Sequence, residues 1–251
     1  MSTAADLREM SLAVLQTAEP RAKAAAARAV RRALDEARLA WPAPWPTDLP
    51  GAPARPERPL RVAPGKTPRR RLGTLEGRIA LLHAIAHIEF NAIDLAFDMA
   101  VRFGGDPALG GAARDRFLAE WIAVGDDEAR HFGLVADRLE ALGAAYGDLA
   151  AHDGLWGAAR ATAPLVLEAR GLDVTPGMID RLNSAGDPVS AGILEIIYAD
   201  EVGHVATGMR WFRHVCRAAG LDPETRYQGL VQQYYRGGLK PPFNTDARDR
   251  A

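Results

Sequence analysis

Cysteine is almost missing from the sequence, since Cys216 is the only one among 251 residues. A single cysteine excludes an internal disulfide and a zinc site built from cysteines, and it is typical of a reducing compartment. Long apolar runs are missing too, because none approaches the roughly 18 residues that a membrane span needs. The first residues also lack the basic-then-apolar pattern of a secretory signal. We therefore expect a cytoplasmic protein that does not bind or cross a membrane.

An excess of charge of one sign is also missing. Lys and Arg together number 31 and Asp and Glu 32, which gives a net charge of -1 at pH 7. Such a balance argues against bulk electrostatic binding to nucleic acid or to an anionic membrane surface. No stretch shows the alternation of a β-strand, whereas 48% of the residues are hydrophobic, many of them at helical spacing. These features predict an all-α fold with a substantial core.

Prolines divide the chain into four parts. Pro20 separates two N-terminal helices, because a proline inside a helix removes one N–H and clashes with the preceding turn. Trp41 and Trp45 predict that the proline-rich part lies against the body of the protein as extended chain. The four expected parts are an N-terminal helical segment packing on a bundle (1–40), a Pro-rich extended connector (41–72), a four-helix bundle (73–219) and a C-terminal helix with a tail (220–251).

Apolar periodicity and local start and stop signals define the expected helices. Pro164 lies inside the third long helix, where it either kinks that helix or begins a new one. The Thr-Pro pair at 175–176 and the Asp-Pro pair at 187–188 are typical helix starts, with Pro at the first helical position. The tail at 240–244 is expected to be extended. The expected helices of the bundle and C-terminal part are 74–102, 112–142, 153–170, 175–184, 188–219 and 222–236.

One pattern, Asp-Glu-x-x-His, occurs twice, once with Glu128 and His131 and once with Glu201 and His204. In each copy Glu and His are three residues apart and so share one face of a helix. An ionised carboxylate on the core face of a helix is costly unless it is paired or binds a metal. Each pair is therefore predicted to give one carboxylate and one imidazole to a metal. The remaining stripe residues are Phe117, Trp121, Val124, Val135, Leu139 and Leu142 for the first copy, and Ser190, Leu194, Ile197, Gly208, Trp211 and Val215 for the second.

Two further carboxylates complete the set. Glu89 and Glu168 each lie on an otherwise apolar stripe of their own helix. The order along the chain is Glu, Glu-x-x-His, Glu, Glu-x-x-His, which is the ligand set of di-iron and di-manganese carboxylate bundles. Four carboxylates and two imidazoles would then surround two metals. The alternative is a hydrogen-bonded core network without a metal.

The stretches 87–95, 127–132, 200–206 and 240–244 resemble the ferritin-like superfamily, and more closely its domain of unknown function 455 family. This resemblance implies a ferritin-like four-helix bundle with a dinuclear metal site. In the superfamily pattern, Glu128 and Glu201 bridge the two metals. Glu89 and Glu168 are then terminal ligands, and each metal takes one His. A distant relative of known activity is the tRNA hydroxylase that acts on a modified adenosine.

A ligand set with four carboxylates and two imidazoles suits iron or manganese better than zinc or copper. We expect two iron ions, with manganese as the alternative. Asp127 and Asp200 each precede a ligand by one residue, so each could accept the second N–H of a metal-bound His on a neighbouring helix. The Asp-Glu-Ala-Arg-His stretch resembles diiron monooxygenases, and this resemblance implies a similar supporting role for Arg130. The simpler interpretation is that these three residues are exposed on their helices.

Four other side chains allow a functional interpretation beside a structural one. His83 and His87 have the spacing of a zinc pair, but a surface or supporting role is favoured. Glu195 lies about 120° from the ligand stripe on a helix and is a candidate additional carboxylate. Tyr198 lies near the stripe and could be a redox-active tyrosine or a packing residue. The packing interpretation is favoured.

Three functions fit the predicted site. The favoured one is an O2-dependent oxidoreductase, a hydroxylase or oxidase, acting on an unknown small-molecule or modified-nucleoside substrate with electrons from a donor protein. The second is an iron-handling or peroxide-detoxifying protein without an organic substrate. The third is a helical interaction module whose metal is structural or vestigial. The proline-rich connector and additional helices argue against a storage cage, so we expect a monomer or dimer.

Overall fold

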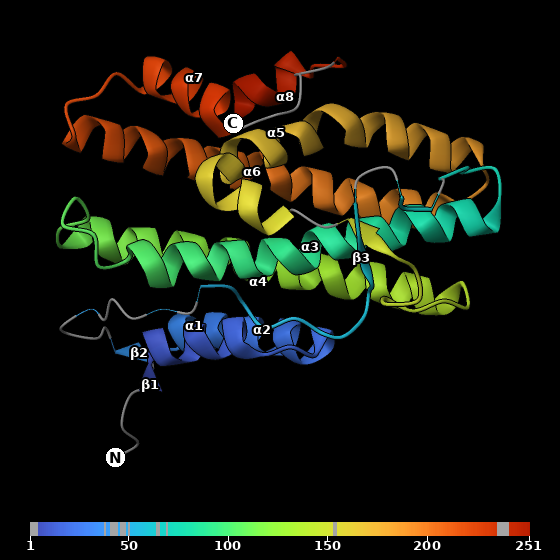
Figure 1. Cartoon of the computed structure of the whole chain (residues 1–251), viewed down its shortest axis with the longest axis horizontal. Helices are drawn as coiled ribbons and strands as arrows, with labels where there is room; N and C mark the ends of the chain where they lie inside the picture. The colour runs from blue at the N-terminus through green and yellow to red at the C-terminus, as the bar shows by residue number, and fades with distance from the viewer. Residues whose placement is uncertain are drawn as a thin grey trace. The chain divides into compact units, whose positions relative to one another are not determined.

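The computed structural model describes residues 5–37, 39–40, 45, 49, 51–63, 66–68, 70–152, 155–234 and 241–251, and for residues 5, 39–40, 155–168 and 234 it describes the backbone alone. Within these residues the protein is all-α, as predicted, with eight helices and four two-residue strands (Figure 1). The helices are α1 (Leu7–Gln16), α2 (Pro20–Asp35), α3 (Leu75–Phe103), α4 (Ala112–Ala141), α5 (Leu155–Ser184), α6 (Pro188–Ala218), α7 (Pro223–Tyr234) and α8 (Thr245–Arg250). The strands are β1 (Ala5–Asp6), β2 (Leu39–Ala40), β3 (Arg61–Val62) and β4 (Ala151–His152).

The chain folds into two compact units. Unit 1 consists of Met1–Val62 and His83–Ala151, and unit 2 consists of Ala63–Leu82 and His152–Ala251. The boundary falls within α3, so that most of this helix belongs to unit 1. Unit 1 contains the packed helices α3 and α4, whose Phe90 and Phe132 rings lie 6.0 Å apart. Unit 2 contains the packed helices α5 and α6. Each unit is thus built on one pair of long helices.

The helices α3 and α4 approach each other closely at Gly125. A Cβ atom built on Gly125 would lie 2.5 Å from Cε2 of Phe97, a separation that real Cβ atoms essentially never show. Phe97 is fully buried and has no space into which to move. The absence of a side chain at Gly125 therefore sets the spacing of this helix pair, one turn before Glu128.

We expect Gly125→Ala to destabilise the protein by about 1–3 kcal/mol, the usual cost of overpacking a filled core. The measurement is urea unfolding of the metal-free protein. Gly133→Ala is the matched control, because Gly133 is on the same helix and a Cβ there meets nothing within 4 Å. The control should be neutral or stabilising by up to about 1 kcal/mol. Equal stability of the two variants would contradict the close approach.

The N-terminal helices belong to unit 1, where α2 packs along α4. Pro20 is the first residue of α2, and the Glu19 carboxylate caps this end of the helix by accepting from backbone N–H groups. The Arg21 guanidinium pairs with Asp137 at 2.9 Å and with Glu140 at 2.6 Å, both on α4. The strands β1 and β2 on either side of these helices pair in parallel.

Trp45, in the described part of the proline-rich region, packs against the end of α3 and the two glycines that follow it. The indole N–H of Trp45 donates to the carbonyl of Val101 at 2.8 Å, and its ring covers Gly104 and Gly105. Trp45 thus packs as the sequence suggested, whereas Trp41 lies outside the described residues. Further along, β3 pairs with β4.

Two basic side chains meet one buried aspartate in unit 1. Lys23 Nζ, from α2, forms an ion pair with Asp94 Oδ1, and Arg55 Nη1 lies 2.6 Å from Asp94 Oδ2. Lys23 and Asp94 are fully buried. Both cations also lie over the Phe90 ring, 5.3 and 5.4 Å from its centroid. Burial raises the pKa of Asp94 to about 6, with Lys23 and Arg55 opposing the rise, so Asp94 is ionised at neutral pH. Residues Lys23, Arg55 and Asp94 are called the ion triad below.

The helix α5 corrects one prediction. It runs without interruption from Leu155 to Ser184, whereas the sequence predicted two helices, 153–170 and 175–184. The Thr-Pro pair at 175–176 therefore lies inside a helix. The helix α5 packs on α6, and such tertiary contact overrides the loss of one backbone hydrogen bond at a proline.

The helix α6 begins as predicted, with Pro188 at its first position and the Asp187 side chain accepting from the backbone N–H of Ser190 at 3.0 Å. Its apolar stripe is buried up to Trp211, but Val215 is 44% exposed and Cys216 is buried instead. The expected stripe is therefore wrong in the last turn, where the buried position is Cys216 and not Val215. The short helix α8 was not predicted either, and Asn244 caps it.

The helix α3 contains a window long and apolar enough to cross a membrane, although the sequence analysis expected none. Polar residues are spaced through this helix, so no continuous apolar run reveals the window. Within the protein 72% of the window is buried. A helix at the core of a folded domain has this composition and burial, because it packs on several sides.

Candidate metal centre

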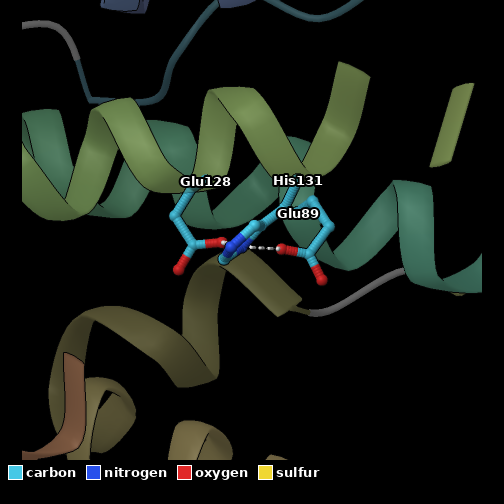
Figure 2. A group of neighbouring side chains, drawn as sticks. All are labelled: Glu89, Glu128 and His131. Carbon is cyan, nitrogen blue, oxygen red and sulfur yellow. Dashed lines mark ion pairs between the residues drawn. The ribbon is translucent and has the colours of Figure 1, made fainter. Parts of the chain in front are cut away.

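Three predicted ligands meet between α3 and α4 in unit 1. Glu89 comes from α3, and Glu128 and His131 come from α4 (Figure 2). Their exposed fractions are 5%, 3% and 0%. Figure 2 shows the His131 ring between the two carboxylates. The three residues are called the unit 1 cluster below.

The distances within the unit 1 cluster suit a shared cation. His131 Nδ1 lies 3.3 Å from Glu89 Oε2 and 3.4 Å from Glu128 Oε2. One ligand atom of each residue lies within 4.8 Å of the other two. Two carboxylates and one imidazole are a donor set that iron and manganese accept. The residues that are present therefore fit a divalent metal ion.

The sequence of α4 explains why these side chains point inward. The predicted stripe residues Phe117, Trp121, Val124, Val135 and Leu139 are all buried, together with Glu128 and His131. Because helix positions three and four apart lie on one face, burying the apolar members also buries the two polar ones. The apolar stripe of α4 thus places the Glu128 carboxylate and the His131 imidazole in the core, one helical turn apart.

The charges of the unit 1 cluster depend strongly on one another. Burial and the nearby Glu128 carboxylate raise the pKa of Glu89 well above its usual range. Burial lowers the pKa of His131, but hydrogen bonding and charge from Glu128 and Glu89 outweigh it and raise the pKa to about 11. His131 is therefore an imidazolium at neutral pH in the metal-free protein. Its stabilising effect is fully present below its unfolded pKa of about 6.5 and is lost as the pH rises through about 11.

This protonation makes metal binding depend on pH. A metal needs the neutral imidazole, so binding must release at least about one proton per chain, and affinity should rise with pH. Titration calorimetry with Mn(II) at pH 6.5 to 8, in buffers of different ionisation enthalpy, measures the protons released. His131→Gln should release fewer. Binding heats that do not depend on the buffer would contradict a protonated His131.

The second predicted pair lies on α6 in unit 2. His204 Nδ1 is 3.3 Å from Glu201 Oε2, and their side chains are 3% and 13% exposed. On α5, a Cβ built on Gly171 would lie 3.6 Å from Glu201 Oε1, so the helix backbone passes close to this carboxylate. Glu168 is three residues before Gly171 and shares its face of α5, but its side chain lies outside the described residues. Its role as a ligand stays a prediction.

The three predicted supporting residues are less buried than the ligands. Asp127 and Arg130 pair with each other at 3.6 Å, and their side chains are 38% and 39% exposed. Asp200 is partly buried on α6. Their proposed role in orienting the ligands stays a prediction.

The two histidines with zinc spacing are buried, and hydrogen bonds occupy one nitrogen of each. His83 Nε2 accepts from the backbone N–H of Gly147 at 3.0 Å, and burial lowers the pKa of His83. His87 Nδ1 lies 2.8 Å from the Tyr146 hydroxyl. The sequence gave no signal for Tyr146, whose ring packs against both histidines. These contacts favour a structural role, which corrects the expectation of a surface position.

The other two candidates differ in their surroundings. Glu195 is exposed on α6, which makes it a poor additional ligand. The Tyr198 hydroxyl accepts from the side-chain amide of Asn244 at 2.9 Å. Tyr198 also packs beside Leu172 and Val205, which are buried, so the packing interpretation agrees with its contacts.

Fold and site together define a class: an all-helical protein with a buried carboxylate–histidine cluster able to hold a metal ion. Residues 16–251 match the family model described as "Protein of unknown function (DUF455)", and the chain belongs to this family. It is 43% identical over 208 residues to a Haemophilus influenzae protein named "Uncharacterized protein", covering 79% of this chain and 72% of the relative. No solved structure matches the chain.

Proposed function

We propose that the protein is a dinuclear metal carboxylate protein that uses iron for an O2-dependent oxidation. The observation that carries the proposal is the unit 1 cluster, in which two carboxylates and an imidazole are buried together with their ligand atoms within 4.8 Å of one another. Burying such groups without a cation is costly. The order of Glu and Glu-x-x-His along the chain supports a second metal.

The proposed ligands are divided between the metals according to the superfamily pattern. In that pattern Glu128 and Glu201 would bridge the two metals, Glu89 and Glu168 would be terminal ligands, and His131 and His204 would each hold one metal. Manganese is the alternative metal, because the same donor types suit it.

Iron held by such ligands would supply the electrons for the reduction of O2. The side chains of the unit 1 cluster would bind the metal and exchange a proton for it. Glu89 and Glu128 supply carboxylate oxygens where a cation would lie, and His131 holds a proton that it releases on metal binding. Glu89, Glu128 and His131 are themselves at most 5% exposed, so bulk water is excluded from them.

The proposed substrate is an organic small molecule or a modified nucleoside, and a donor protein would supply the electrons that the reaction needs. We propose that the protein acts in the cytoplasm as a monomer or dimer. A nearly neutral net charge makes nucleic acid an unfavoured partner.

Peroxide removal is the second candidate. Its support is the burial of the unit 1 cluster, no member of which is more than 5% exposed. A small oxidant reaches such a site more readily than a bulky substrate does.

Oxygen consumption tests the proposal. Protein loaded anaerobically with Fe(II) should consume O2 at least about tenfold faster than the same concentration of Fe(II) with His131→Ala, since even the loss of a group that only orients a metal ligand typically costs about 10- to 100-fold. Glu120→Ala is the control, because Glu120 lies on the same helix and its carboxylate meets the exposed Arg116 at 2.8 Å. Faster reaction with hydrogen peroxide than with O2 would favour the second candidate. A wild-type rate no higher than that of His131→Ala would contradict both.

A further inference from the structure

The last residues of the chain fold back on the α5–α6 pair in unit 2. Residues 241–251, here called the C-terminal clasp, contain an irregular start and the helix α8. Ala247 is fully buried and packs with Leu172 of α5 and Val205 of α6. Residues 241–244, which were predicted to be extended, form neither helix nor strand, and residue 240 lies outside the described residues.

Asp173 of α5 is the anchor of the C-terminal clasp. Arg248 Nε donates to Asp173 Oδ1 at 2.9 Å, and Arg248 Nη2 donates to Oδ2 at 2.6 Å. The backbone N–H of Asn244 also donates to Asp173 Oδ1 at 2.9 Å. The Asp173 side chain is fully buried. A paired guanidinium fork on a buried carboxylate is both strong and directional, so it fixes where the clasp lies on α5.

Asn244 extends this anchor to α6. Its side-chain amide donates to the carbonyl of Leu172 at 3.2 Å and to the hydroxyl of Tyr198 at 2.9 Å. One residue of the C-terminal clasp therefore joins the backbone of α5 to a side chain of α6. The hydroxyl of Tyr198 and the carbonyl of Leu172 are held at a fixed separation as a result.

The joined positions lie next to the candidate ligands of unit 2. Tyr198 is three residues before Glu201 and so lies one turn from it on the same side of α6. Leu172 directly follows Gly171, whose backbone passes close to Glu201. Val205, which contacts Ala247, directly follows His204.

We propose that the C-terminal clasp is a positioning element that holds the α6 turn of Glu201 and His204 in register with α5. Arg248 and Asn244 act through Asp173 and Tyr198 and do not touch a metal. The inference rests on the proposed function, because the ligand role of Glu201 and His204 does. It gives a purpose to the Pro-Pro-Phe-Asn stretch at 241–244, which the metal site itself does not use.

Hydrogen exchange on the metal-free full chain tests the positioning directly. Arg248→Ala should raise exchange in peptides covering 196–206 by about tenfold, because local opening becomes easier when few contacts hold a segment. Peptides covering 120–132 in α4 should not change. Arg250→Ala is the matched control, since Arg250 is on the same helix and its guanidinium donates only to the carbonyl of Asp246 among the described side-chain bonds. Unchanged exchange at 196–206 in Arg248→Ala would overturn the proposal.

Mn(II) titration of the same proteins tests the link to the ligands. Arg248→Ala should weaken the ion held by His204 by about tenfold, at the low end of the effect of groups that orient ligands, and should weaken the other ion, which shares only Glu201 with it, by less. Arg248→Lys keeps the charge without the paired fork and should recover part of the affinity. Equal weakening of both ions, or of neither, would overturn the positioning role.

A milder variant and the metal-free exchange measurement keep failure of the C-terminal clasp proposal distinct from failure of the proposed function. If Arg248→Ala does not fold, Tyr198→Phe takes its place, because this variant removes only the hydroxyl that meets Asn244 and should fold. It should show the same changes in hydrogen exchange and in Mn(II) affinity, at smaller size. A wild-type protein that binds no Mn(II) or Fe(II) would contradict the proposed function. The exchange experiment would then still decide whether the C-terminal clasp holds this part of α6.

Discussion

Glu128→Gln is expected to lower the affinity of the protein for Fe(II) by more than about 100-fold, since even the loss of a group that only orients a ligand costs about 10- to 100-fold. The substitution keeps the shape of the side chain and removes its charge. It takes one of the two carboxylates that surround His131 Nδ1. In the proposed dinuclear site it also removes a bridge, so both metals should be weakened. Anaerobic titration with Fe(II) or Mn(II) measures the effect.

Glu120→Ala is the control for this prediction. Glu120 is on the same helix, but it pairs with the exposed Arg116 at 2.8 Å. We expect the metal affinity of the Glu120→Ala variant to equal that of the wild-type protein. Circular dichroism should show that both variants remain helical. Retention of wild-type affinity by Glu128→Gln would contradict the assignment of the unit 1 cluster as ligands.

Asp94→Asn is expected to destabilise the protein by about 3–5 kcal/mol, because removing one partner of a buried ion pair leaves uncompensated charge in the core. Lys23 is fully buried beside Asp94, and Arg55 lies 2.6 Å from it. That loss is a large fraction of the total stability of a typical domain, which is about 5–15 kcal/mol. Urea unfolding of the metal-free protein at neutral pH, where Asp94 is ionised, measures it.

An exposed ion pair supplies the comparison. Arg31 and Asp35 are one turn apart on α2, at 2.9 Å, with side chains 35% and 54% exposed. Asp35→Ala should cost less than about 1 kcal/mol, the usual range for a solvated pair. If Asp94→Asn were no more costly than Asp35→Ala, the ion triad would not be a significant part of the stability of unit 1.

The helices and the inward ligands of α4 could be predicted because both depend on local periodicity. Seven stripe positions of α4, from Phe117 to Leu139, are buried as predicted. A polar pair on such a stripe has to enter the core with its apolar neighbours. Local chemistry also specified the start of α6, where Asp187 accepts from the N–H of Ser190. These features need no knowledge of which segments meet in space.

The features that the sequence did not reveal depend on distant partners. Lys23 on an apparently amphipathic helix gave no sign that it would be buried against Asp94 and Arg55, because nothing local distinguishes it from a solvated lysine. The continuation of α5 through the Thr-Pro pair at 175–176 depends on its packing along α6. The anchoring of Arg248 on Asp173 joins residues 75 positions apart. Periodicity identifies the buried face of a helix, but it does not identify which distant charge will pair with which.

Metal content is the most direct test of the central claim. Wild-type protein, purified and loaded anaerobically with Fe(II) and then freed of excess metal, should contain about two iron ions per chain, the number that the ligand order predicts. Glu128→Gln treated in the same way should contain far less. Wild-type protein without bound iron or manganese would contradict the claim, and the unit 1 cluster would then be a hydrogen-bonded network in the core of a helical interaction module.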